Sequence, residues 1–490
     1  MADVIINGIT LGGVPTSIGG STATDDTLTL LGSASLAISD IESVIGSTGV
    51  DTIRLNNANP DTVSVSAIES LIGSTGTDIV SLADQATMSI SGVETVIGSS
   101  LGDKLTLLTA GSLAVSDVAS VVGTSGADTV TLLTDGTLAI SAVDTVIGSS
   151  GSADTVQLLN SGTLKVSGVE SVLGGAGTAE VVVMLEPGDS IAVSDINTVI
   201  GTTDTTEAVT LLTNGTVAVS AIDSVVGTAG ADTVNLLVGS SVSVSDVDTV
   251  LGSTGTDVVT LATTGNLSVS RVETVVGTAD TSEILTLLTA GNVAVSDIDS
   301  VIGTTASTDA VTLLTTGTIA VSGVDSVVGT TDTTDVVNLL NAGTLKVSGV
   351  DSVTGSSTQT EIVQLLAAGS LTVSDIDTVV GSTGTDTLSF GTTGTIVVSG
   401  VESVIGTSDA TDVVQLLAAG AVSVSDVDTV IGTTGTGDSV TLVNTGALTV
   451  SGVETVTGTA TTTDVLTLTG GGVVRVSDVA SVIGSTASDT

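Results

Sequence analysis

Carboxylates are almost the only side chains in this sequence that could bind ions or transfer protons. The chain has 53 Asp and Glu residues against 6 Lys and Arg, and it has no His and no Cys. Carboxylates can act as general acids and bases, or they can bind hard cations such as Ca²⁺. A catalytic site also needs a group of residues that differs from its surroundings, but acidic residues recur throughout and the basic residues are scattered. We therefore expect that the protein is not an enzyme.

The acidic residues fall into three sets. First-set residues follow a short loop that contains Gly, and second-set residues, such as Glu69 and Asp144, follow a Val about sixteen positions later in the chain. Stacking of the second set would place like charges opposite each other, which is destabilising, so we expect divalent ions or salt to stiffen the protein. Third-set residues directly precede that Val, where most other repeats have Gly or Ala, and their spacing indicates either relief of charge repulsion or a metal site. The third set is Asp40, Asp117, Asp195, Asp246, Asp297, Asp375, Asp426 and Asp478.

Six of the loops before first-set residues share the form Gly-x-x-Gly-x-Asp, as in GSTGTD and GTSGAD. These loops resemble the G-G-x-G-x-D-x-U-x nonapeptide of the RTX family of secreted β-roll proteins, although Ser or Thr replaces the second Gly and the motif is not in tandem. The resemblance implies that loop carbonyls and the aspartates bind Ca²⁺. The residues also allow another interpretation, in which Gly makes the turn and Asp caps the next strand. The aspartates are Asp51, Asp78, Asp128, Asp232, Asp257 and Asp386.

An internal repeat positions these acidic residues. A Val-Ile-Gly-like tripeptide closes each unit, and its glycine recurs nineteen times from Gly19 to Gly484, at spacings of 25 to 27 residues. The unit 123–148 divides into three short apolar runs, TVTLL, TLAIS and VDTVI. Such alternating runs of Val, Ile, Leu and Thr predict strands, and no window shows the sustained 3.6-residue period of a helical repeat.

We predict an all-β fold, a parallel β-solenoid of about nineteen 25–27-residue coils with three short strands per coil. Three parallel sheets would then surround a narrow core. The expected inward residues of the unit 123–148 are Val130, Leu132, Leu138, Ile140, Val143 and Val146, and the expected outward ones are Thr129, Thr131, Ala139 and Ser141. Length varies mainly in the loop before the first run, and two units carry insertions with Pro60 and Pro187.

The expected organisation is an irregular N-terminal coil that forms a joining edge (1–19), uniform solenoid repeats (20–484) and an open C-terminal edge (485–490). The last residues stop where a first strand should begin, and Val4 to Ile6 can serve as such a strand. Because open parallel edges recruit further strands, this pattern predicts head-to-tail joining of copies. We therefore expect a structural protein that forms an extracellular filament, sheath or surface layer, possibly stabilised by Ca²⁺.

Two other functions fit the pattern. One is an RTX-like adhesin spacer or stalk, and the other is an ice-binding solenoid, which the irregular outward Thr positions disfavour. The formal net charge of -47 disfavours nucleic acid and anionic membranes as partners. No segment approaches the roughly 18 apolar residues of a membrane helix. We expect divalent cations and other copies of the chain as partners, and a location outside the cell or on its surface without a recognisable cleaved signal peptide.

Overall fold

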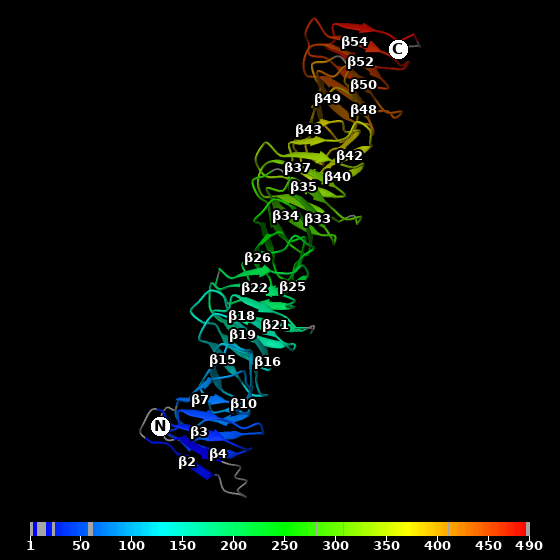
Figure 1. The fold of residues 1–490 in the computed structure, drawn as a ribbon. Coiled ribbons are helices and arrows are strands. Elements are labelled where there is room, and N and C mark those ends of the chain that lie inside the picture. The colour runs from blue at the N-terminus through cyan, green and yellow to red at the C-terminus, as the bar shows by residue number, and fades with distance from the viewer. Residues whose placement is uncertain are drawn as a thin grey trace. The chain divides into compact units, whose positions relative to one another are not determined.

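The computed structural model describes residues 3–6, 16–21, 25–56, 62–175, 177, 179–204, 206–280, 282–306, 308–409 and 411–486. The chain forms two compact units, Met1–Val247 and Asp248–Thr490. Throughout the described ranges the regular elements are β-strands of three to six residues (Figure 1). These ranges contain no helix that is long and apolar enough to cross a membrane.

Each unit is built from two parallel sheets. In the first unit the odd-numbered strands, from β1 (Asp3–Ile6) to β27 (Thr233–Leu236), form one sheet, and the even-numbered strands, from β2 (Thr16–Gly19) to β28 (Ser241–Ser245), form the other. In the second unit the odd-numbered strands run from β29 (Thr249–Leu251) to β55 (Arg475–Ser477), and the even-numbered strands run from β30 (Val258–Leu261) to β56 (Ser481–Ile483). The chain therefore passes from one sheet to the other after every strand, and two strands complete one turn.

The predicted fold class, a parallel β-solenoid, is confirmed, but the predicted three sheets are wrong. The unit 123–148 does contain three strands, β15 (Thr129–Leu132), β16 (Thr137–Ser141) and β17 (Thr145–Ile147). However, β15 pairs with β17 of the same repeat and with β13 (Ser112–Ser116) of the preceding repeat. Three strands per repeat and two strands per turn make each repeat one and a half turns long. Corresponding strands of successive repeats, such as β15 and β18 (Thr155–Leu158), consequently lie in different sheets.

The core lies between the two sheets and is filled by aliphatic side chains. The six residues that were predicted to face inward in the unit 123–148 are at most 7% exposed, and the four predicted outward residues are more exposed. Val130 pairs with Leu113 on one side and with Val146 on the other, and all three are at most 2% exposed. Burial of each such side chain contributes about 1.5–3 kcal/mol, so thin stacked layers form a core without aromatic residues.

The N-terminal strands correct two expectations. Residues 4–6 do form a strand. However, β1 pairs with β3 (Thr27–Leu30) in the same register in which the second strand of a repeat pairs with the first strand of the next repeat. β1 is therefore not a first strand. The glycine that closes this repeat is Gly20, because Gly19 is the last residue of β2. The rest of the expected joining edge in 1–19, most of the expected open edge in 485–490, and Pro60 lie outside the described residues. Pro187 lies in a turn between β21 (Glu180–Met184) and β22 (Ser190–Ser194).

A pair of neighbouring substitutions tests the two faces of β15. Val130→Asp places a charge at a site that is 0% exposed, and we expect it to destabilise the surrounding turns by several kcal/mol. Thr131→Asp, on the outer face of the same strand, should cost less than about 1 kcal/mol. Hydrogen exchange of the segment 123–148 and thermal unfolding measure both effects. Similar exchange rates in the two variants would contradict the assignment of faces.

Candidate functional site

First-set acidic residues lie inside the loop that precedes the first strand of each repeat, which we call the acidic corner. All six predicted calcium ligands are 0% exposed. The structure places each of them in its own corner and does not bring them together. The same position is occupied by a buried acid in the other corners. These acids are Asp26, Asp103, Asp154, Glu180, Glu207, Glu283, Asp309, Asp335, Glu361, Asp412, Asp438 and Asp464.

Hydrogen bonds from the protein account for the burial of these carboxylates. In the corner 123–128, the backbone N–H and the hydroxyl of Thr124 donate to Oδ2 of Asp128 over 2.6 and 2.8 Å. The backbone N–H of Gly111, one turn earlier, donates to Oδ1 of Asp128 over 3.1 Å. Because buried carboxylates are tolerated when such donors surround them, Asp128 holds its own loop and the preceding turn together.

The Ser or Thr that departs from the RTX pattern takes part in every one of the six corners. Its backbone N–H donates to the aspartate over 2.5–2.6 Å. Its hydroxyl accepts the N–H of the second glycine of the loop over 2.9–3.1 Å. From the sequence alone, this residue was interpreted as a departure from a calcium-binding motif. Its presence in all six loops was the signal that could have predicted its structural role. These contacts support the capping interpretation of the aspartates.

Second-set residues fasten the acidic corner to the next turn. The backbone N–H of Asp128 donates to Oδ2 of Asp144 over 2.9 Å, and the carbonyl of Asp128 accepts the N–H groups of Asp144 and Thr145 over 3.1 Å. The expectation that second-set residues stack directly on one another is wrong, because each repeat makes one and a half turns. Equivalent positions on one sheet recur every three strands, about 14 Å apart. That separation exceeds the screening length of about 8 Å, so their repulsion is largely screened in physiological salt.

Three repeats lack an acid at the second-set position, and two of them show what the position supplies. Asn197 replaces the acid in one repeat, and its Oδ1 accepts the N–H of Glu180 over 2.9 Å. In another repeat Ala119 offers no acceptor, and β14 (Val118–Val122) extends so that Val118 pairs directly with Asp103, with a register shift after Asp103. The third repeat has Ala480, and β56 begins only after it. An oxygen acceptor for one backbone N–H is therefore usual at this position, and a negative charge is not required.

Third-set residues share a backbone conformation that explains their residue types. All eight aspartates have φ between 53° and 57°, in the left-handed region. Repeats without Asp have Gly here, as at Gly92, or Ala, as at Ala142, or Arg271. Asp and Gly adopt this conformation more readily than other residues. The alternation of Asp, Gly and Ala thus reflects backbone geometry, and neither charge relief nor a metal site is needed to explain it.

The left-handed residue also explains the glycine that closes each repeat. A Cβ atom on Gly73 would overlap the carbonyl oxygen of Gly92, and one on Gly123 would overlap the carbonyl oxygen of Ala142. Only glycine allows the two turns to approach this closely.

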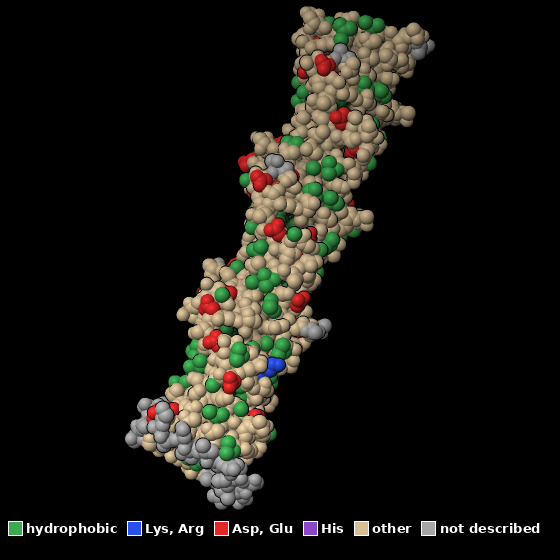
Figure 2. All heavy atoms as spheres, in the orientation of Figure 1, with side chains coloured by type: hydrophobic (Ala, Val, Ile, Leu, Met, Phe, Trp, Pro, Cys, Tyr) green, Lys and Arg blue, Asp and Glu red, His purple; other side chains and the backbone are tan. Residues whose placement is uncertain are grey.

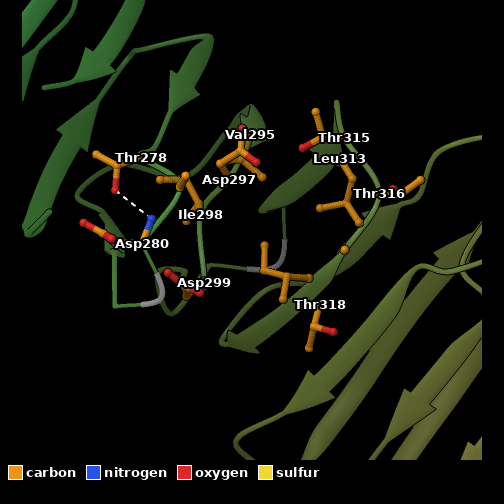
Figure 3. Close-up of a pocket in the computed structure, with 13 residues that line it drawn as sticks. Thr278, Asp280, Val295, Asp297, Ile298, Asp299, Leu313, Thr315, Thr316 and Thr318 are labelled. Atoms are coloured by element: carbon orange, nitrogen blue, oxygen red, sulfur yellow. Dashed lines mark hydrogen bonds between the residues drawn. The ribbon is translucent and has the colours of Figure 1, made fainter. Parts of the chain in front are cut away.

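Shallow pockets recur at the same place in several repeats. One pocket of about 180 Å³ is lined by Thr278 and Asp280 of a corner, by Asp297 and Asp299 after a second strand, and by the turn 315–318 (Figure 3). Equivalent residues line pockets in 175–217, 356–396 and 407–447. Within the described ranges, no group of three or more Asp and Glu side chains is arranged so that it could hold a metal ion. The pockets are repeated features of the corner and do not mark one distinct active site.

A leucine that sequence reasoning did not single out follows the first strand in most repeats. Leu133 is 49% exposed, Leu212 48% and Leu417 61%, although the Leu that precedes each of them is buried. Figure 2 shows hydrophobic and acidic side chains interspersed on the visible face. These leucines do not contribute to the acidic corners.

Acid should weaken the corner of Asp464. The hydroxyl and the N–H of Thr459 donate to Oδ2 over 2.7 and 2.8 Å and hold the pKa of Asp464 below its usual range. A lowered folded-state pKa contributes stability that is complete above the unfolded-state pKa and is lost as pH falls through the folded-state pKa.

We expect Thr459→Val to increase hydrogen exchange of the segment 458–468 at pH 7, and to have little effect at a pH below both pKa values. Thr449→Val, on the outer face of β52 (Ala447–Ser451), is the control and should show no such pH dependence. An equal effect of Thr459→Val at both pH values would contradict this role of the hydroxyl.

Comparison with known proteins does not assign a function to these corners. The chain matches no protein family, and neither a curated protein nor a solved structure matches it.

Proposed function

We propose that the chain is a structural protein whose solenoid joins further copies through its open edges to build an extracellular filament, sheath or surface layer. The supporting observation is the exposure of the last described turn. Val482 in β56 is 47% exposed, whereas Val456, at the same position of β53 (Thr455–Thr457) in the preceding repeat, is 0% exposed. Ile483 beside it is 52% exposed.

The strand edges support the same proposal. β55 pairs with β53, and β56 pairs with β54 (Val465–Leu468), while no described strand covers their other edges. Likewise β1 pairs with β3 on one edge, and no described strand covers its other edge. Open parallel edges present rows of N–H and C=O groups that pair readily with another chain. A further coil placed on β55 and β56 would satisfy these groups and bury Val482.

Repetition of the acidic corner favours a structural role over a catalytic one. Each corner uses its carboxylates to accept hydrogen bonds from its own and adjacent turns, as Asp128 and Asp144 do. The same uniformity also suits the second candidate, a passive spacer or stalk, in which the solenoid separates other parts of a longer assembly.

Electron microscopy distinguishes the two candidates. We expect the purified chain to form unbranched fibres whose abundance rises with concentration. Val482→Lys should reduce them strongly, because a charge at the open edge opposes burial in a junction. Leu417→Lys, which adds the same charge at an exposed corner far from the last turn in sequence, is the matched control and should leave the fibres intact. A strictly monomeric protein at high concentration would instead favour the spacer.

Calcium binding by the six aspartates stays a prediction, and melting experiments can test it. If these carboxylates only accept protein hydrogen bonds, the melting temperatures in millimolar Ca²⁺ and in EDTA at matched ionic strength should be similar. Ca²⁺ that binds the folded state selectively would raise the melting temperature through mass action. A higher melting temperature in Ca²⁺ that equimolar Mg²⁺ does not reproduce would therefore support the calcium site. It would also show that capping is not the only role of these aspartates.

A further inference from the structure

Four acidic corners contain glutamate in place of aspartate, and their carboxyl groups are arranged differently. Glu180, Glu207, Glu283 and Glu361 are 0% exposed, and Oε2 of each is buried without a hydrogen-bond partner within the described part of the chain. Corners with aspartate usually satisfy both oxygens, as at Asp309, where Oδ1 accepts the N–H of Gly291. Among the first-set aspartates, Asp154 alone has a comparable unpartnered oxygen within those ranges.

The longer glutamate side chain reaches the second-set residue of the next turn. Thr278 donates its hydroxyl to Oε1 of Glu283, and the N–H of Glu283 donates to Oδ2 of Asp299 over 2.9 Å. Because Oδ2 of Asp299 accepts the N–H of Glu283, the two carboxyl groups are neighbours, and each of them shifts the pKa of the other. Two ionised carboxylates have no donor to share, so this contact is favourable only when one of the two groups carries a proton.

The same arrangement occurs in other repeats. In the first unit, Thr202 donates to Glu207, the N–H of Glu207 donates to Asp223 over 3.0 Å, and the two carboxyl groups are in contact. In the second unit, the N–H of Glu361 donates to Asp377 over 2.9 Å, and their carboxyl groups are also in contact.

Residue types across the repeats follow the same constraint. Second-set glutamates such as Glu69 and Glu273 accept the N–H of a first-set aspartate. Opposite the four first-set glutamates, however, the second-set residue is always short, and opposite Glu180 it is the neutral Asn197. Oε2 of Glu180 also lacks a hydrogen-bond partner within the described residues, but the neutral amide of Asn197 does not repel its charge, so that corner does not need a shared proton.

We propose that Glu207–Asp223, Glu283–Asp299 and Glu361–Asp377 are proton-binding carboxyl pairs, each of which holds one proton in the folded corner and destabilises the corner when the proton leaves. Such pairs make the solenoid sensitive to pH at three defined turns.

The surrounding charged groups favour the proton. Asp280, in the same loop as Glu283, accepts the hydroxyl of Thr264 over 2.6 Å, and Asp297 accepts the hydroxyl of Ser296 over 2.6 Å. Asp280, Asp297 and Asp299 line one pocket together with the threonines of the turn 315–318 (Figure 3). Asp204 adds negative charge beside Asp223, and Asp375 does so beside Glu361.

The directions of the pKa shifts agree with a shared proton. Burial and contact with Glu283 raise the pKa of Asp299, and burial together with Glu207 and Asp204 raises the pKa of Asp223. Hydrogen bonds from Thr278 and Asp299 outweigh the effect of burial and lower the pKa of Glu283. A raised folded-state pKa contributes stability that is complete below the unfolded-state pKa and is lost as pH rises through the folded-state pKa. This direction is opposite to that of Asp464.

Asp299→Asn tests the proposal because it copies the pairing of Glu180 with Asn197. Hydrogen exchange of the segment 277–300 in the full chain is measured at pH 5 and pH 8 and corrected for intrinsic exchange rates. In the unmodified protein, we expect this segment to open more often at pH 8 than at pH 5, by about tenfold for each unit by which the folded-state pKa of the pair exceeds 5. Asp299→Asn should remove most of that increase.

The reciprocal variant and a control complete the experiment. Asn197→Asp should create a fourth carboxyl pair and make the segment 174–198 open more at pH 8 than at pH 5. Asp309→Asn, in a corner without a carboxyl pair, should increase opening without this dependence on rising pH. If the segment 277–300 opened equally at both pH values in the unmodified chain, or if neither Asp299→Asn nor Asn197→Asp changed the pH dependence of its segment, the proposal would be overturned.

Discussion

A buried carboxylate in each corner allows the chain to pass from one sheet to the other without leaving polar backbone groups unsatisfied. Strands satisfy their own backbone groups, but the segments between strands contain N–H groups that face the interior. Asp128 accepts donors from its own loop and from the preceding turn, and its own N–H and carbonyl bond to the following turn. Burial of an isolated charge would be very costly, and these donors offset that cost. One residue therefore links three successive turns, through its carboxylate on one side and its backbone on the other.

The second constraint comes from the closing glycine and the left-handed residue of the next turn. The carbonyl of the left-handed residue occupies the space that a Cβ would fill, as Ala142 does at Gly123. This contact fixes how closely turns approach at that point. Because each repeat covers one and a half turns, the contact and the acidic corner alternate between the two sides of the solenoid. The same alternation separates equivalent carboxylates by about 14 Å within a sheet, which makes the formal charge of -47 tolerable.

Local features were predictable from the sequence, whereas strand pairing was not. The strands of the unit 123–148 and the inward position of Val130 followed from alternation of apolar and polar residues. The number of sheets could not be predicted, because the first and second strands of a repeat each bury two similar aliphatic side chains and the third buries one, so any of them could stack on any other. Alternation indicates which face of a strand is buried, and it contains no information about which strand lies above it.

The sequence located the acidic positions of the candidate site correctly. Their roles, however, were predicted from their negative charge alone. Asn197 shows that the second set is defined by an acceptor oxygen, and the positive φ of Ala142 shows that the third set is defined by backbone conformation. Both exceptions were visible in the sequence: Asn197 keeps a side-chain oxygen without the charge, and Ala142 has no side-chain oxygen that could bind a metal. The difference between Asp and Glu in the first set was also visible, but its meaning depends on whether the carboxyl group reaches the next turn. One additional methylene places the carboxyl group of a first-set glutamate beside that of a second-set aspartate. Burial and the neighbouring Asp377 raise the pKa of Glu361, whereas hydrogen bonds from Thr459 lower the pKa of Asp464 at the equivalent position. The acidic composition of this chain is therefore not a uniform surface property, and each carboxylate must be interpreted from the donors that surround it.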